Sequence, residues 1–363
     1  MHSLFWSSFS ALDRYFAGSP GAYLNILTRG SLIEAARRWD NLSYPGLEGV
    51  DGLAEEPERT LLVRCDAPAG LGEAPAPREA FPVLELLYEP ESNRFVDTRG
   101  IYPLLRDPET PWLTDALEEA ASWEPFLEAA ALVSRYPYRW TPGQIPEGSS
   151  GWPVLAPLAQ RIGLERILEG SRPWEGLRLL YHGGFVREHW PELAAMNPVD
   201  QSKEHHPEGN VWEHTLETFL HRKGRDLRIS LALLLHDVGK PLAEEEEGRR
   251  FNRHAQIGRT AAYRFLDRLG FDGEIKEAVG FLVGHHMIPG LSRSLPTGRV
   301  REVLSSPLYP LLLEVYRCDL CSTYRGPEGY YQACKVYRSF LKNSRNPFRG
   351  EDGKKILRMY VEK

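Results

Sequence analysis

The chain has 363 residues, of which 42% are apolar and 26% are charged, and its net charge is −6. This length gives room for two or three domains, and the apolar fraction is high enough to exclude global disorder. The mixture of both charge signs, with a small acidic excess, excludes a protein that coats nucleic acid or an anionic membrane by bulk electrostatics.

Hydropathy and cysteine content indicate the cellular compartment in which the protein is expected. The longest apolar run, Ile229 to Leu235, is far shorter than the roughly 20 residues that span a bilayer. The first residues, Met1 to Phe16, lack the basic start and long apolar core of a signal peptide. Four cysteines do not make a disulfide framework, and Cys318 and Cys321 lack the second pair that a zinc site needs. These features predict a cytoplasmic protein with no membrane partner.

The first 110 residues mix strand-like and helical pieces. Arg59 to Cys65 and Phe81 to Tyr88 are short apolar runs bounded by Pro, Gly and Asp clusters, which predicts two strands. Asp66 to Pro77 is rich in Ala, Pro and Gly and predicts a loop, and a last short strand is expected at Phe95 to Asp97. Residues 1–110 are therefore predicted to form a small α+β head.

The rest of the chain is predicted to be helical, so the fold class is mainly α. Apolar residues recur at spacings of three and four within residues 111–196, which predicts a helical neck. The helical pattern continues through residues 197–345 and predicts an all-α C-terminal domain. Residues 346–363 are predicted to be a tail, and the polar, basic stretch from Tyr330 onward is expected to fray.

Histidines are concentrated in the C-terminal half, where eight of the eleven fall within residues 205–286. Neutral histidine is the commonest metal ligand in proteins. His214 lies in the first turns of a helix that Asn210 is expected to cap and that is expected to reach Arg222. It shares a side with Val211 and so faces inward. Taken alone, this position favours a core histidine that is bonded to a carbonyl group over a metal ligand.

His236 and Asp237 form the second candidate group. They follow the almost uniformly apolar run Ile229 to Leu235, which must be buried, and Gly239 and Pro241 end the helix directly after them. Two adjacent polar side chains at the end of a buried helix carry a large desolvation cost unless they are paired or bound to a metal. A divalent cation removes that cost.

Asp319 repeats this argument on another helix. The helix expected at Leu311 to Tyr324 is apolar on one face, and Asp319 lies beside that face. An acidic side chain that points into a helical core needs a cation. Arg317 and Arg325 are close enough in sequence to form a simple salt bridge with it instead.

His254, His285 and His286 extend the set. His285 and His286 follow another buried run at a helix end, and His254 opens a helix. Additional imidazoles beside a first metal would allow a second one, and paired metals about 3.5–4 Å apart stabilise the attacking and leaving oxygens of a phosphoryl transfer. His and Asp ligands accept Mn, Fe, Co, Ni, Zn or Mg, so the sequence predicts one or two divalent ions of unspecified identity.

The order of these residues across several helices resembles the HD superfamily of metal-dependent phosphohydrolases. The resemblance implies that the first histidine, the His-Asp doublet and the last aspartate hold a metal, and that further histidines hold a second. These ligands would be His214, His236, Asp237 and Asp319, with His254, His285 and His286 for the second ion. It also implies catalytic roles for Asp237, which would orient water or bridge the metals, and for Lys240, which would contact a substrate phosphate. Lys240 is otherwise a solvated loop lysine.

Flanking motifs narrow the resemblance to the bacterial tRNA CCA-adding and poly(A) polymerase family. The C-terminal motifs are His205-His-Pro-Glu-Gly-Asn-Val-Trp-Glu-His-Thr-Leu216, Leu234-Leu-His-Asp-Val-Gly-Lys-Pro241 and Arg253-His-Ala-Gln-Ile-Gly258. Two upstream segments are also similar to this family. The connector into the HD domain is similar to Gly183-Gly-Phe-Val-Arg-Glu-His-Trp-Pro-Glu-Leu193. The end of the nucleotidyltransferase head is similar to Leu86 to Asp97. The likeness is strong from Gly183 to Arg325 and faint before it.

The head departs from this family. In the family, a Gly-Ser pair is followed by two acidic residues, one residue apart, that hold magnesium. Gly18-Ser19 is present here, but no such acidic pair follows it, and residues 129–140 lack most of the signature of the nucleotide-selecting helix. Without paired carboxylates a two-metal transferase cannot neutralise a triphosphate. We therefore expect a degenerate head.

These observations predict a metal-dependent phosphohydrolase or phosphodiesterase without nucleotide-adding activity. Its substrate would be a nucleotide or RNA-end phosphoester, since related HD domains act on 2′,3′-cyclic phosphates and nucleotide monophosphates, and tRNA or another RNA is a possible partner. The alternative is a catalytically inactive RNA-binding or regulatory relative of the tRNA nucleotidyltransferases.

Overall fold

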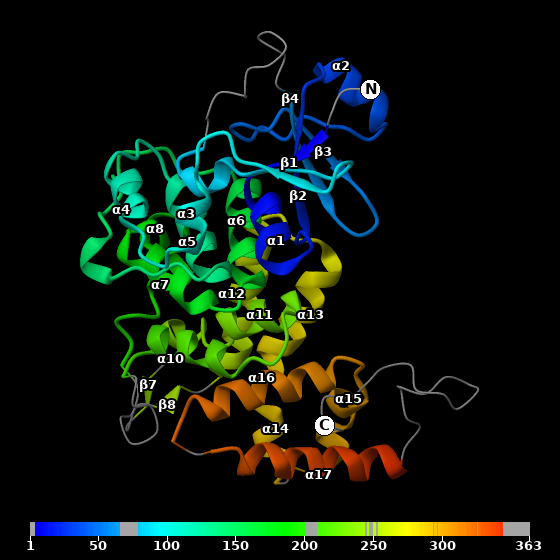
Figure 1. Cartoon of the computed structure of the whole chain (residues 1–363). Helices are drawn as coiled ribbons and strands as arrows, with labels where there is room; N and C mark the ends of the chain where they lie inside the picture. The colour runs from blue at the N-terminus through cyan, green and yellow to red at the C-terminus, as the bar shows by residue number, and fades with distance from the viewer. Residues whose placement is uncertain are drawn as a thin grey trace. The chain divides into compact units, whose positions relative to one another are not determined.

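The computed structural model describes most of the chain as two compact units, Met1–Ile167 and Leu168–Lys363 (Figure 1). The described residues are 4–65, 79–200, 209–243, 245–246, 250–251, 253–292, 294–295, 297–324 and 326–343. The expected fold class is confirmed, because the chain is mainly helical with one small sheet near the N-terminus. The expected boundaries at residues 110, 196 and 345 stay predictions.

A six-stranded mixed sheet forms the centre of the N-terminal unit. Its strands are β1 Leu4–Trp6, β2 Tyr23–Thr28, β3 Gly52–Glu55, β4 Thr60–Cys65, β5 Leu87–Glu89 and β6 Arg94–Val96. Their order is β3-β4-β2-β1-β5-β6. β2 and β4 are parallel, with Tyr23 opposite Thr60, and the other neighbouring strands are antiparallel.

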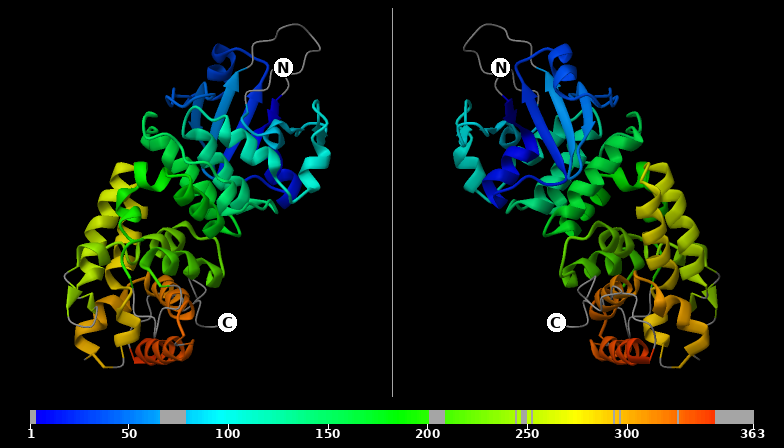
Figure 2. Two further views of the ribbon diagram at one scale, coloured as in Figure 1. Left: turned by 90° about the vertical axis from the view of Figure 1, so that its left-hand side faces the viewer. Right: turned by 90° about the vertical axis from the view of Figure 1, so that its right-hand side faces the viewer.

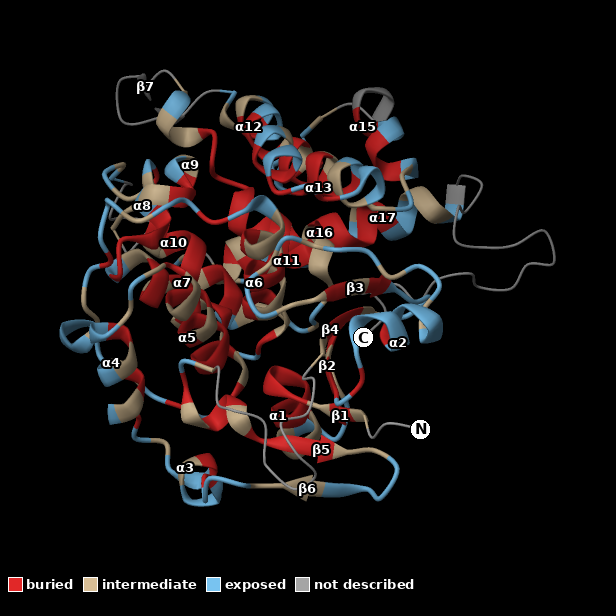
Figure 3. Cartoon of the chain, turned by 90° about the horizontal axis from the view of Figure 1, so that it is seen from above, coloured by how far each residue is buried: buried red, intermediate tan, exposed pale blue. Residues whose placement is uncertain are grey.

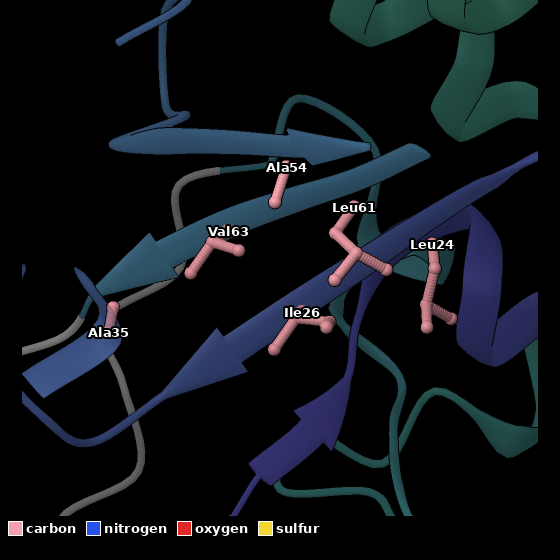
Figure 4. Close-up of a cluster of buried hydrophobic side chains, with 6 residues drawn as sticks. All are labelled: Leu24, Ile26, Ala35, Ala54, Leu61 and Val63. Atoms are coloured by element: carbon pink, nitrogen blue, oxygen red, sulfur yellow. The ribbon is translucent and has the colours of Figure 1, made fainter. Parts of the chain in front are cut away.

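Strands β2 and β4 are buried on both faces. The side chains on one face form an apolar cluster: Leu24, Ile26, Ala35, Ala54, Leu61 and Val63 (Figure 4). On the other face Tyr23 and Leu62 pack against Ile162 of helix α6. Because successive side chains of a strand point to opposite faces, these two strands need apolar residues at nearly every position.

Helices cover this sheet and complete the N-terminal unit. They are α1 Ser8–Ala17, α2 Leu32–Arg38, α3 Tyr102–Arg106, α4 Pro111–Glu118, α5 Glu124–Arg135 and α6 Pro157–Glu169, with 3₁₀ turns at Pro82–Glu85 and Pro142–Gln144. A buried ion pair joins two of them: the guanidinium of Arg135 donates to both carboxylate oxygens of Asp13 at 2.8 Å. The Tyr136 hydroxyl donates to the same carboxylate at 2.8 Å.

The C-terminal unit is almost entirely helical. Its helices are α7 Pro173–His182, α8 Phe185–His189, α9 Pro191–Ala194, α10 Val211–Thr218, α11 Leu227–Leu235, α12 His254–Arg268, α13 Gly273–His285, α14 Ile288–Leu291, α15 Thr297–Ser305, α16 Tyr309–Cys321 and α17 Glu328–Asn343. A small hairpin, β7 Glu245–Glu246 and β8 Arg250–Phe251, precedes α12. Figure 2 shows these helices in two further views. Helices α11 and α16 are buried along most of their length, and α17 exposes one face (Figure 3).

Several expected elements differ from the structure. The strand expected at Phe81 to Tyr88 is a 3₁₀ turn followed by the short strand β5, since Pro82 lacks the N–H that a strand needs. The helix expected to reach Arg222 ends at Thr218 and continues as a 3₁₀ turn. Tyr330 does not begin a frayed segment, because α17 runs to Asn343. The loop expected at Asp66 to Pro77 lies outside the described residues. None of the described helices is long and apolar enough to cross a membrane.

We expect Arg135→Met to lower the free energy of unfolding of the N-terminal unit by about 3–5 kcal/mol, because it leaves the Asp13 carboxylate buried without its cation. Urea unfolding followed by tryptophan fluorescence measures this loss. The control is Arg94→Met, which breaks an exposed pair with Glu89 and should cost less than about 1 kcal/mol. Equal losses in the two variants would contradict the stabilising role of the buried pair.

Candidate metal centre

His214 and Asp319 meet although they are far apart in sequence. Asn210 caps α10 by accepting a bond from the backbone N–H of Glu213 at 2.8 Å, and His214 is completely buried one turn later. Asp319 lies near the C-terminal end of α16, and its Oδ1 is 3.1 Å from Nε2 of His214. Both side chains point inward in the structure, as the sequence predicts.

His236 and Asp237 follow the last residue of α11 and are only 1% and 2% exposed. The turn after them packs closely on α12: a methyl group at Gly239 would lie 2.2 Å from the carbonyl oxygen of His254. Only glycine permits this approach. The turn therefore brings the start of α12, with His254, to the His-Asp doublet.

The two oxygens of Asp237 face two different groups of imidazoles. Oδ2 is 3.2 Å from Nε2 of His236 and 3.7 Å from Nε2 of His214. Oδ1 is 3.5 Å from Nε2 of His254 and 4.0 Å from Nε2 of His286. Two sets of potential metal ligands thus share one carboxylate.

Spacings within each set suit a metal ion. The Nε2 atoms of His214 and His236 are 3.4 Å apart, and those of His254 and His286 are 3.1 Å apart. Two nitrogens about 2.1 Å from one ion lie about 3.0–3.4 Å apart in octahedral or tetrahedral geometry. His285 lies outside both sets: its Nδ1 bonds the Phe281 carbonyl and its ring packs on the Phe281 ring.

Hydrogen bonds at the opposite ring nitrogens orient the ligand atoms. Nδ1 of His236 donates to the Leu233 carbonyl at 2.8 Å, and Nδ1 of His286 donates to the Val283 carbonyl at 2.7 Å. A carbonyl only accepts, so Nδ1 carries the proton and Nε2 of each neutral ring carries a lone pair. These lone pairs point toward carboxylates and toward each other, an arrangement that requires a cation between them.

Electrostatics keep the ligands in the forms that bind metal. Burial, followed by the neighbouring His236 and His254, lowers the pKa of His286 to about 4, so its ring is neutral near pH 7. Burial alone would raise the pKa of Asp237, yet His236 and Lys240 beside it hold that pKa well below its usual range. Asp319 behaves in the same way: burial raises its pKa, but the contacts with the imidazoles of His214 and His236 together lower it. Both carboxylates are therefore ionised.

Lys240 and the arginines expected near Asp319 have clear positions. The Lys240 ammonium lies 2.7 Å from Oδ2 of Asp237, so it is not a solvated loop lysine. Arg317 pairs with Glu314 of its own helix rather than with Asp319. Arg325 lies outside the described residues.

A separate pocket lies within the N-terminal unit. It has a volume of about 810 Å³ and is lined by residues of β2, β4, α5 and α6 among others. Glu79, Glu128, Arg64 and Arg166 contribute its main charges. Burial and the nearby Glu79 raise the pKa of Glu128 to about 8, and burial also raises the pKa of Glu79. Sequence reasoning missed this group because its members come from separate segments.

Comparison with known proteins places the metal centre in a family. The model of the HD domain matches residues 211–323, which include every proposed ligand from His214 to Asp319. A CC-adding tRNA nucleotidyltransferase of Thermus thermophilus is 39% identical over 203 residues, which are 53% of this chain and 46% of that protein. A multifunctional CCA protein of Pseudomonas savastanoi is 30% identical over 237 residues, which are 59% and 55% of the two chains. The chain carries an HD domain and is homologous to CCA-adding tRNA nucleotidyltransferases.

The similarity to these relatives covers only part of each chain. The chain spans about half the length of these two relatives. Among solved structures, the Bacillus stearothermophilus CCA-adding enzyme in complex with CTP has a TM-score of 0.52 at 13% identity, covering 93% of this chain and 78% of that one. At this identity the match shows a shared fold. Together with the two His/Asp sets in the HD domain, the comparisons confirm the expected dependence on divalent metal ions.

The relatives contradict the expected function. A phosphohydrolase defined by the loss of nucleotide addition, or an inactive RNA-binding relative, is not supported, because the Thermus thermophilus relative is named a CC-adding tRNA nucleotidyltransferase. The expectation rested on a search for two acids one residue apart. The structure gathers Glu79 and Glu128 around one pocket from distant segments, so close sequence spacing was not a sufficient test.

We expect the metal-free protein to lose stability as the pH falls from about 6.5 to about 4. In that window the unfolded chain protonates His286 and the folded protein does not, so acid favours unfolding. The contribution is on the order of 3 kcal/mol. Urea unfolding of the protein in chelator, compared with His286→Gln, measures it: the variant should show a shallower pH dependence in this window. An identical dependence in both proteins would contradict the buried neutral state of His286.

Proposed function

We propose that the chain is a divalent metal-dependent enzyme of tRNA-end processing that hydrolyses phosphoesters at its HD domain and adds nucleotides at the pocket of its N-terminal unit. The position of the Asp237 carboxylate between two sets of imidazoles is the main support for phosphoester hydrolysis at the HD domain. The proposal includes a cytoplasmic RNA substrate. The Thermus thermophilus relative, which is named for tRNA, supports this part.

In the HD domain, one ion would be held by His214, His236 and Asp319. The other ion would be held by His254 and His286, and Asp237 would be a ligand of both ions. Bound divalent ions supply positive charge to the phosphoryl oxygens and acidify water. The imidazoles of His214, His236 and His286 present Nε2 in a fixed direction because Nδ1 of each ring is hydrogen-bonded, which pre-organises the site. Lys240 lies 2.7 Å from the shared carboxylate and would donate its ammonium protons to a substrate phosphate oxygen. Hence the phosphoester would lie on the Lys240 side of Asp237.

Asp237→Asn should lose metal from both sets and lower hydrolysis by more than about 100-fold, since the shared ligand loses its charge. Metal content by mass spectrometry and hydrolysis of an RNA end with a 2′,3′-cyclic phosphate are the two measurements. Asp267→Asn, which changes an exposed carboxylate of α12, is the matched control. A metal-free wild type after incubation with Mn²⁺, Ni²⁺, Co²⁺ and Mg²⁺ would rule out this function.

Nucleotide addition is the second candidate activity, and the charged pocket of the N-terminal unit favours it. Arg64 and Arg166 can bind phosphates, and Glu79 and Glu128 can bind a hydrated Mg²⁺ ion. The two acids repel each other, since the charge of Glu79 raises the pKa of Glu128. A bound cation would relieve this repulsion and favour ionisation of Glu128.

The double variant Glu79→Gln and Glu128→Gln should lower incorporation of CTP or ATP into tRNA lacking its 3′ end, by on the order of 100-fold. Exposed Glu91 provides the control Glu91→Gln. Incorporation is measured with labelled nucleotide in Mg²⁺. If the wild type adds no nucleotide to such a tRNA, or the double variant adds it at the wild-type rate, this second activity is excluded.

A further inference from the structure

His214 differs from the other anchored ligands in how its ring is held. The rings of His236 and His286 each bond a backbone carbonyl three residues earlier in their own helix. Nδ1 of His214 instead faces the hydroxyl of Ser322, 3.3 Å away and 108 residues later in sequence. Ser322 directly follows α16 and is only 6% exposed.

The hydrogen bonds of Ser322 determine its role. Its hydroxyl donates to the carbonyl oxygen of Asp319 at 2.6 Å. A hydroxyl has one proton, so its remaining lone pairs face His214 and accept the Nδ1 proton. The opposite arrangement, with the Ser322 proton on Nδ1, would leave two acceptors 2.6 Å apart and would be repulsive.

We propose that Ser322 is a positioning residue that holds His214 in the tautomer with the proton on Nδ1 and the metal-binding lone pair on Nε2. This inference rests on the proposed metal centre and adds a residue that neither the HD pattern nor the comparisons identify. Ser322 bonds both the backbone of Asp319 and the ring of His214. It therefore couples the orientations of two ligands on different helices, α10 and α16.

The first test is metal binding. Ser322→Ala removes the acceptor, and its affinity for Mn²⁺ by isothermal titration calorimetry should fall by about 10–100-fold, as for other partners of metal-bound histidines. Ser322→Thr restores the hydroxyl and should stay within about threefold of wild type. The control is Ser292→Ala, which removes a buried hydroxyl that donates to the Pro289 carbonyl at 2.7 Å. This control should bind Mn²⁺ as wild type does.

The second test uses the wild-type protein and does not depend on the folding of a variant. Long-range ¹⁵N–¹H spectra of histidine-labelled protein report which ring nitrogen carries the proton. With Zn²⁺ bound, His214 should show a protonated Nδ1, and its Nε2 resonance should shift on metal binding. A bare Nδ1 in the Zn²⁺-bound wild type, or wild-type Mn²⁺ affinity in a folded Ser322→Ala, overturns the proposal. Failure of the wild type to bind any metal would instead overturn the proposed HD function.

Discussion

The carboxylate of Asp237 is the group on which the metal centre depends. It is buried at the end of an apolar helix, and two imidazole sets and the Lys240 ammonium surround its two oxygens. A buried carboxylate is tolerable only with nearby positive charge, and converging imidazole lone pairs are tolerable only around a cation. Divalent ions on either side of the carboxylate would meet both requirements. The turn at Gly239 packs closely on the start of α12 and so brings His254 next to the Asp237 carboxylate.

The sequence pointed to most of the side chains that the structure brings together here, because burial and polarity conflict within short segments. His236-Asp237 follows a run of leucines, and Asp319 lies beside the apolar face of α16, so both had to find a cation inside the protein. The sequence could not distinguish His285 from His286, because adjacent residues at a helix end differ by about 100° in direction. Ser322 gave no signal, since a serine after a helix usually bonds only its own backbone.

The N-terminal unit was harder to predict. Burial on both faces removes the alternation that marks a strand from both β2 and β4. Strand β4 was found because turn-forming residues bound its apolar run, whereas β2, which contains the polar Asn25, was missed. The chemistry of this unit was judged from residues close in sequence. Glu79 and Glu128 line one pocket although 48 residues separate them in the sequence, which a local motif cannot reveal. The function expected from the missing motif was accordingly wrong.

One measurement tests the central claim most directly: the anomalous difference map of a crystal grown with Mn²⁺. The account predicts two peaks about 3.5–4 Å apart, one on each side of the Asp237 carboxylate. Nε2 of His214 and His236 should contact one peak, and Nε2 of His254 and His286 the other. A map with no peak at Asp237, or with a peak that none of these imidazoles contacts, would contradict it.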